Sequence, residues 1–573
     1  MRLIGILALI GAVPVPNSQP ARFDWVSYAG TDGADVPDGS YRNPVLAGFY
    51  PDPSVVRVGA DFYLVNSTFS WFPGIPVFHS RDLVHWTQIG NAIDRPGQLD
   101  FKRLGMSRGI FAPDISHHDG RFFIVTTCVD CGGNFVITAA DPKGPWSDPI
   151  WLPSVEGIDP SLVFEDDGSA SIVNNRAPVG PPRYEGHRAL WIERFDPRAL
   201  KMLGNPRMIV DGGVDPTTKP VWIEGPHIFR ADGRYYLTAA EGGTAVAHSQ
   251  VVFRADRVDG PYSPAPPTVN PILTQRDLDP ARENPVTSAG HADFVRLADG
   301  RWWATFLATR PYRGDLYNTG RETFLLPVTW KDGWPVILPR GVAIPRVAAQ
   351  LLPTPPSRTA PDRASARAAT PMTGTFTARD EFDGPSLLPL WMTMRTPRTP
   401  GWRVAGGALL LEARAEGIGD HGQPSFVARR QAHRDASVTT SMMFDPANGA
   451  EAGLAAVQDD DHFLAVAVTR HDGRPAVRVS RRASAAEPAT GRTLAMIPIG
   501  SAALGRSIRL RIVARGALYD LDYAIGTGAW RTARNDVDGS ILSTALAGGF
   551  TGTMIGPYAR AAPRQPSMVS GVD

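Results

Sequence analysis

The sequence predicts an all-β protein in which a five-bladed β-propeller is followed by a β-sandwich. Three observations support this prediction: a high content of 57 glycines and 53 prolines, short strand-like runs without a strong helical period, and a phrase that recurs five times. Glycine and proline at this frequency suit a chain of strands and turns. The length of 573 residues implies at least two domains.

The recurring phrase is a turn, usually Asp-Gly-Arg, followed at once by an apolar or aromatic strand. The turns begin at Ala60, Asp119, Asp167, Asp232 and Asp299, so they are 59, 48, 65 and 67 residues apart. Each turn joins two strand-like runs into a hairpin. Five hairpin units at near-regular spacing predict a propeller of five blades over residues 41–350.

One residue stands eight positions before each turn, at the head of the first strand of its hairpin. Under five-fold pseudo-symmetry these positions form one ring at the mouth of the central channel: Asp52, Phe111, Asp159, Glu224 and His291. Each Asp by itself could simply start a turn, because Asp-Pro pairs often do so. Three acids at matching offsets favour a functional site instead, since crowded carboxyls perturb one another's pKa values.

The N-terminal residues 1–21 have features of a secretory signal segment. A basic start at Arg2 precedes an apolar run from Leu3 to Val13, which is too short to span a bilayer. Prolines crowd the expected cleavage site, which disfavours cleavage there. Because of the basic start and the apolar run, we expect a secreted or periplasmic protein, with a cytoplasmic location as the alternative.

The charges and cysteines exclude several other classes of protein. The chain has 58 basic and 57 acidic side chains, a balance that argues against a nucleic-acid or membrane partner. Cys128 and Cys131 are too few for a disulfide-built scaffold. Two cysteines are too few for a zinc site, which needs four ligands, and the βαβ context of a redox motif is absent. We therefore assign them no role.

A second domain follows a change in composition after Leu352. Proline, arginine and alanine with little apolar pattern predict a connector over residues 351–374. From about Phe376 short alternating runs return, for example at 437–444 and 508–514. These runs, bounded by Gly, Asp and Asn turns, predict a β-sandwich over residues 375–562.

At the ring positions the sequence resembles glycoside hydrolase family 43, in the branch of exo-acting β-xylosidases and α-L-arabinofuranosidases. The resemblance rests on motifs in order along the chain: NPV at 43–45, GFYPDPS at 48–54, WFPGIPV at 71–77, HSRDL at 79–83, APDI at 112–115, IEGPH at 223–227 and GRET at 320–323. The phrase DEFD at 380–383 resembles the concanavalin-like C-terminal domain of the same branch.

The resemblance implies a role for each acid of the ring. Asp52 would be the general base that activates water, and Glu224 the general acid that protonates the leaving oxygen. Asp159 would raise the pKa of the acid and orient it. The remaining positions that the resemblance assigns to substrate binding are Arg321, Phe69, Phe111, Thr244, Trp71, His291 and Phe550.

Several of these positions have a structural alternative. Arg321 could pair with a structural acid, and His291 could be a hydrogen-bonded core imidazole. Trp71 could pack inside a blade, and Phe550 could be a buried strand residue. Phe111 stands where relatives commonly carry Trp, which leaves the finer substrate preference open.

The sequence thus predicts an inverting exo-glycoside hydrolase that releases terminal xylose, α-L-arabinofuranose or both from xylo- and arabinoxylo-oligosaccharides. No cofactor is required by this chemistry; the resemblance leaves a bound calcium ion and a homo-oligomer open. The alternatives are a catalytically silent carbohydrate-binding propeller and a glycosidase of the same fold acting on another pentose-containing glycan. A fructan hydrolase is disfavoured, since the residues around Asp52 do not match its Asn-Asp-Pro-Asn-Gly type motif.

Overall fold

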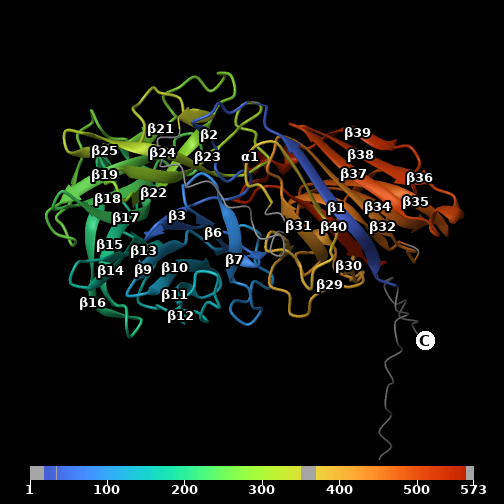
Figure 1. The fold of residues 1–573 in the computed structure, drawn as a ribbon, viewed down its shortest axis with the longest axis horizontal. Helices are drawn as coiled ribbons and strands as arrows, with labels where there is room; N and C mark the ends of the chain where they lie inside the picture. Colours follow the sequence, from blue (N-terminus) through green and yellow to red (C-terminus); the bar gives the residue numbers. More distant parts are fainter. Residues whose placement is uncertain (1–18, 34, 350–369, 448, 563–573) are drawn as a thin grey trace, which may run out of the picture.

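The computed structural model describes residues 19–33, 35–349, 370–447 and 449–562. Two domains lie side by side, a propeller and a sandwich of two sheets (Figure 1). This confirms the predicted fold class. Most of the predicted signal segment and most of the predicted connector lie outside the described residues.

Five antiparallel sheets form the blades of the propeller. The first blade contains β3 (Ser54–Val58), β4 (Asp61–Val65), β6 (Gly74–Ser80) and β7 (Thr87–Ile93). The second contains β9 (Asp114–His118), β10 (Arg121–Val129), β11 (Gly133–Ala139) and β12 (Ile150–Trp151), with β8 (Gly109–Ile110) beside β10. The third contains β13 (Ile158–Phe164), β14 (Ala170–Arg176), β15 (Ala189–Asp196) and β16 (Lys201–Asp211). The fourth contains β17 (Glu224–Ala231), β18 (Arg234–Glu241), β19 (Ser249–Ala255), β20 (Ser263–Pro264) and β21 (Leu273–Thr274). The fifth contains β22 (Thr287–Arg296), β23 (Trp302–Thr309), β24 (Glu322–Lys331) and β25 (Trp334–Val336).

Each of the five repeated turns joins the first two strands of a blade, as the spacing predicts. In the second blade Asp119 and Gly120 both have positive φ, 48° and 70°, which is the backbone of a tight two-residue hairpin. The first strands β3, β9, β13, β17 and β22 are neighbours around the channel. A short pairing of β2 (Ser40–Arg42) with β26 (Val347–Ala349) joins the two ends of the propeller.

The sandwich has two eight-stranded sheets. One contains β29 (Trp402–Val404), β30 (Leu409–Leu411), β1 (Ala21–Thr31), β32 (Asp435–Met443), β37 (Ile508–Arg515), β38 (Leu518–Ile525) and β39 (Arg531–Asp538), with β27 (Phe376–Asp380) on β1. The other contains β36 (Arg492–Pro498), β35 (Arg474–Ala483), β34 (His462–His471), β33 (Glu451–Asp459), β40 (Met554–Arg560), β31 (Ser425–Arg430), β28 (Met392–Met394) and β5 (Trp71–Phe72). The short helical elements of the described residues are α1 (Thr544–Ala547) and the 3-10 turns Pro216–Thr218, Ile418–Asp420, Ser501–Ala503 and Ser540–Leu542.

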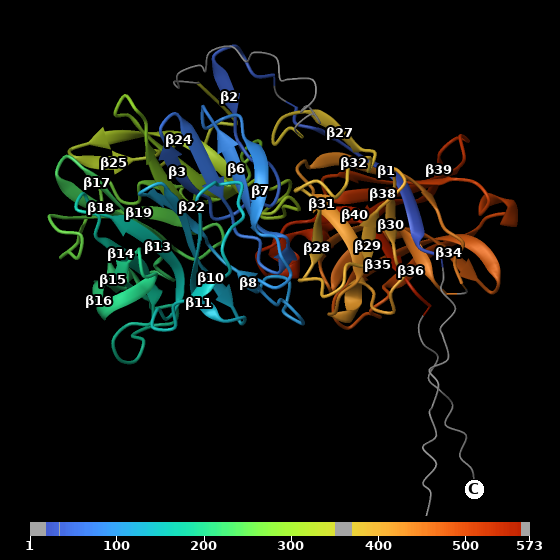
Figure 2. The same ribbon diagram turned by 60° about the horizontal axis from the view of Figure 1, so that its bottom comes forward.

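Two strands cross the boundary between the domains. In Figures 1 and 2 the blue β1 lies among the orange strands of the sandwich, although it precedes the propeller in the chain. It pairs along its length with β32. The propeller strand β5 extends the second sheet by pairing Trp71 with Met394. The sequence predicts neither strand as part of the sandwich, because strand partners far apart in the chain leave no local signal.

Two further observations concern the chain as a whole. Cys128 and Cys131 form a disulfide across the turn between β10 and β11. The described helices include none with the length and apolar character to cross a membrane.

Candidate active site

Four of the ring residues lie at or just before the start of an innermost strand and His291 lies within β22, at positions where the backbone departs from regular pairing. The pairing register shifts beside Asp159, Glu224 and His291. Asp52, Asp159 and His291 have φ values of 51°, 53° and 54°, a left-handed conformation uncommon for residues other than glycine. Bulges of this kind re-aim side chains, and such strain concentrates at functional sites.

Asp52 is buried and accepts two hydrogen bonds. Ser67 Oγ donates to its Oδ2 at 2.6 Å, and Arg321 Nη1 donates to its Oδ1 at 3.2 Å. Burial by itself would raise the pKa of Asp52, but the charges of Arg321 and His291 and the Ser67 hydrogen bond lower it below its usual value. A carboxylate that stays ionised in this way can accept a proton from water.

Glu224 is the first residue of β17, and its environment has the opposite effect. Among the described residues no hydrogen bond or ion pair to its carboxyl group is found. Burial, reinforced by the negative charge of Asp159, raises the pKa of Glu224 to about 8. The group therefore carries a proton at neutral pH and can donate it.

Asp159 and His291 lie directly beside Glu224. The backbone N–H of Gly225 donates to Asp159 Oδ2 at 3.2 Å, and His291 Nε2 lies 3.7 Å from the same oxygen. Burial by itself would lower the pKa of His291, but the hydrogen bond and charge of Asp159 and the charge of Asp52 raise it to about 9. Gly225 is needed here, because a Cβ atom would lie 2.6 Å from the His291 ring.

Three aromatic rings and a guanidinium group pack together next to the carboxylates. Phe69 lies 5.3 Å from Phe111 and 5.7 Å from Phe550, measured between ring centroids. Arg321 Cζ lies 5.3 Å from the Phe550 centroid and 5.9 Å from that of Phe69. Phe550 belongs to the sandwich, and Ser107 of the propeller accepts a hydrogen bond from its backbone N–H at 2.8 Å. The sandwich thus contributes an aromatic wall beside the ring.

The other two predicted substrate-binding residues are Thr244 and Trp71, and Trp71 belongs to the same apolar cluster as Phe69. Thr244 is half-buried in the loop between β18 and β19. Trp71 is fully buried, and its ring packs against Phe426 of the sandwich at 6.2 Å. This position favours a packing role between the domains rather than inside a blade. Substrate contact by either residue stays a prediction.

Ser67 and His248 are two residues of the site that the sequence does not predict. His248 is fully buried, donates from Nδ1 to the Ser288 carbonyl at 3.0 Å and packs against Gly290, beside His291. Burial lowers its pKa to about 4, so the ring is neutral. Both residues lie outside the eight-residue offset, and no local motif marks them, so only the folded backbone reveals them.

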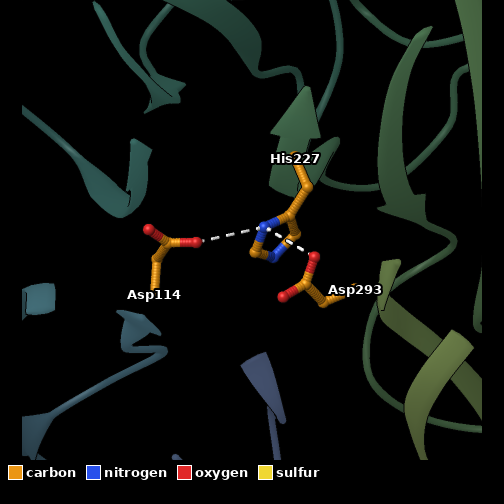
Figure 3. Close-up of side chains that lie close together, drawn as sticks. All are labelled: Asp114, His227 and Asp293. Carbon is orange, nitrogen blue, oxygen red and sulfur yellow. Dashed lines mark ion pairs between the residues drawn. The ribbon is translucent and has the colours of Figure 1, made fainter. Parts of the chain in front are cut away.

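A second group of acidic and imidazole side chains, Asp114, His227 and Asp293, lies in the channel (Figure 3). We call it the channel triad. His227 Nδ1 is 3.4 Å from a carboxylate oxygen of Asp114 and 3.4 Å from one of Asp293. Burial would lower the pKa of His227, but the two carboxylates raise it. The imidazole is therefore favoured in its charged form between two anions.

The oxygens of the channel triad also tie the blades together. Asp114 accepts hydrogen bonds from Ser116 Oγ and from the Leu162 N–H of the third blade. Asp293 accepts from Ser54 Oγ and the Val55 N–H of the first blade, and from the Phe294 N–H. With Asp114 on the second blade, His227 on the fourth and Asp293 on the fifth, the triad links all five blades.

The channel triad does not fit a resident calcium ion. Its three donor atoms lie within 4.8 Å of one another, but calcium prefers six to eight oxygen ligands. The carboxylate oxygens already accept N–H and O–H bonds, and the third donor is an imidazole nitrogen rather than an oxygen.

Comparison with known proteins identifies the family. A family model described as glycosyl hydrolases family 43 matches residues 41–335. The chain belongs to this family. A second model, described as the beta xylosidase C-terminal concanavalin A-like domain, matches residues 379–569. The resemblance inferred from the motifs is thereby confirmed, and this family 43 chain is a glycoside hydrolase.

Several relatives cover most of this family 43 chain. A xylosidase/arabinosidase of Butyrivibrio fibrisolvens is 39% identical over 435 residues, which are 75% of this chain and 80% of the relative. A non-reducing end α-L-arabinofuranosidase of Bacteroides ovatus is 34% identical over 537 residues, 91% of each chain. The crystal structure of a GH43_12 protein retrieved from a capybara gut metagenome superposes with a TM-score of 0.85 at 35% identity, covering 95% of this chain and all of that one.

Proposed function

We propose that this family 43 protein is an inverting exo-glycosidase that releases terminal xylose and α-L-arabinofuranose from xylan-derived oligosaccharides. The observation that carries the proposal is the opposite shift of two neighbouring acids. The pKa of Asp52 is lowered, whereas that of Glu224 is raised to about 8. A pair of carboxyl groups whose environments separate their pKa values in this way provides one base and one acid.

In this mechanism Asp52 takes a proton from the water that attacks the anomeric carbon. Glu224 gives its proton to the glycosidic oxygen as the bond to the leaving sugar breaks. Asp159 keeps the acid protonated until then. The positive charges of Arg321 and His291 compensate the negative charges of Asp52 and Asp159. Asp52 and Glu224 return to their starting states by exchange of protons with solvent.

The packing of Phe550 against the propeller supports exo-cleavage. Phe550 reaches from the sandwich to the Phe69 and Phe111 rings and is anchored by Ser107. A wall from a second domain limits how far a polysaccharide can extend through the site. Aromatic rings also suit the apolar faces of an uncharged sugar. The names of the relatives, xylosidase/arabinosidase and α-L-arabinofuranosidase, agree with a pentose substrate.

A proton NMR time course tests the proposal. With xylobiose, the first product signal is expected to be α-xylose, because inversion at a β-linkage gives the α-anomer. An arabinose-substituted xylo-oligosaccharide run in parallel measures release of arabinose. Initial β-xylose would contradict inversion, and binding of both sugars without any product would leave a carbohydrate-binding propeller as the function.

We also propose export from the cytoplasm. The Cys128–Cys131 disulfide is typical of an oxidising compartment, and the sequence of residues 1–21 is typical of a signal segment. N-terminal sequencing of the protein from the periplasm or medium is expected to show a start after the apolar run. Recovery of the uncleaved chain from the cytoplasm alone would contradict export.

A further inference from the structure

The disulfide between Cys128 and Cys131 has no part in the reaction proposed above. It closes the turn between β10 and β11, and its two residues are only three positions apart in the chain. The stabilisation that a disulfide gives by restricting the unfolded chain is smallest for short loops. A link across so short a loop therefore acts mainly on the conformation of the turn and of the segments bound to it.

The backbone of this turn has a conformation that a free chain seldom adopts. Asp130 has a φ of 62°, and Gly132 and Gly133 follow with φ values of 136° and 88°. A left-handed conformation is uncommon for a residue other than glycine. Cys128 is fully buried in the apolar core of the second blade, and Cys131 packs against the same core. The disulfide thus ties an unusual turn to the core of its blade.

The end of β10 that enters this turn is bound to the backbone of two active-site rings. Cys128 pairs with Ile110 of β8. The Phe111 N–H donates to the Thr127 carbonyl at 2.9 Å. The Phe69 N–H donates to the Ile110 carbonyl at 2.9 Å, and the Ile110 N–H donates back to the Phe69 carbonyl at 3.1 Å. The Phe69 and Phe111 backbones are therefore held, through Ile110 and Thr127, to the strand end that the disulfide closes.

A second connection leads from the turn to the third ring, which comes from the sandwich. Arg108 Nε donates to Asp130 Oδ2 at 2.6 Å, and Arg108 Cζ lies 6.0 Å from the Phe111 centroid. The neighbouring residue Ser107 accepts the hydrogen bond from the Phe550 N–H at 2.8 Å. One turn of the second blade is thus joined by backbone pairing and by an ion pair to the segments that hold all three rings.

We propose that the Cys128–Cys131 disulfide positions the aromatic wall, formed by the rings of Phe69, Phe111 and Phe550, for binding of the sugar. With the link in place the three rings are ordered before the sugar arrives, so binding does not lose the free energy of ordering them. The two cysteines are positioning residues, because they act through the turn and through β8. This inference rests on the proposed function, which assigns the wall to sugar binding.

Calorimetric titration of the full chain with D-xylose tests the positioning role without requiring turnover. In Cys131→Ser an oxygen replaces the sulfur of a half-buried side chain, and Cys128 remains as a buried thiol. We expect the dissociation constant to rise about three- to tenfold, because side chains that are no longer ordered must be immobilised on binding. On xylobiose KM should rise to the same extent with kcat little changed. Ile137→Val, in the core of the same blade, is the matched control and should leave the dissociation constant unchanged.

Amide hydrogen exchange measured by mass spectrometry locates the effect in the chain. In Cys131→Ser we expect faster exchange around the hydrogen-bonded amides of Phe69 and Phe111, with β13 and β14 of the third blade unchanged. Equal xylose affinity in Cys131→Ser and the wild type, an equal loss in Ile137→Val, or exchange that rises throughout both blades would each overturn the proposal. A wild type that binds xylose but does not cleave xylobiose would contradict the glycosidase reaction alone, so the two failures are distinct.

Discussion

The channel holds two groups of the same residue types that differ in how their oxygens are used. The ring combines carboxyl groups with His291, and the channel triad combines Asp114 and Asp293 with His227. The two groups share strands, since His291 and Asp293 lie on β22 and Glu224 and His227 on β17. In the triad the oxygens accept bonds from several blades, whereas the Glu224 carboxyl accepts none among the described residues.

The difference shows what separates a structural acid from a reactive one. Carboxylates saturated with N–H and O–H donors, with an imidazolium between them, have no capacity left for a substrate. Glu224 is buried beside Asp159 without a donor, and its pKa rises to about 8. The following predictions test this contrast, from the largest expected effect to the smallest.

Asp52→Asn should lower kcat by about 10³-fold or more, because the amide cannot take a proton from the attacking water. The loss should be equal on xylobiose and on an aryl xyloside, since both need the base. Steady-state kinetics measure it, and a circular dichroism spectrum checks the fold. Activity within tenfold of the wild type would remove Asp52 as the base.

Glu224→Gln should lower kcat on xylobiose by about 10²–10⁴-fold. An aryl xyloside with a good leaving group should lose far less, because its oxygen needs little protonation. The ratio of the two losses is the measurement, and each substrate is the control for the other. Equal losses on both would contradict the acid assignment.

Asp293→Asn should instead cost stability, about 3–5 kcal/mol, because it leaves a buried imidazolium with one anion fewer. Urea unfolding measures the change in free energy, and kcat of the folded fraction should stay within about tenfold of the wild type. Asp299→Asn is the matched control on the same blade. Its pair with Arg301 is exposed to solvent and should contribute little to stability. A stable but inactive Asp293→Asn protein would show that the triad takes part in catalysis.

Asp159→Asn should move the alkaline limb of the kcat/KM profile to lower pH. The acid must be protonated, so activity is lost as pH rises through the pKa of Glu224, which is about 8 in the wild type. Removing the Asp159 charge lowers that pKa, because a neighbouring anion no longer opposes ionisation. Asp167→Asn, in the exposed turn of the same blade, should leave the limb unchanged. A limb that stays in place in Asp159→Asn would assign it to another group.

Chelation should have the smallest effect. Because the channel triad is satisfied by its own imidazolium and donors, we expect incubation with EDTA to leave kcat and thermal stability unchanged. Re-addition of calcium should likewise have no effect. A fall in either quantity that calcium restores would show a resident metal that this donor set does not explain.

Much of the grouping of residues at the candidate active site could be predicted from local patterns. The turns at regular spacing specified five blades, and the offset from each turn selected Asp52, Asp159 and Glu224. Ser67 and His248 were out of reach, because their positions depend on how loops return to the ring. Trp71 was also ambiguous, since an aromatic strand residue looks the same in a pocket and between two domains.

The sequence by itself determined the repeat, the alternation of buried and exposed residues and the order of the acids, because these depend on neighbours along the chain. Only the tertiary structure decided that β1 joins the sandwich, that Phe550 reaches the propeller and that Asp114 and Asp293 enclose His227. Each of these contacts joins residues far apart in the chain. Their free energies depend on burial and on which donors remain unpaired, and neither quantity exists before the chain has folded.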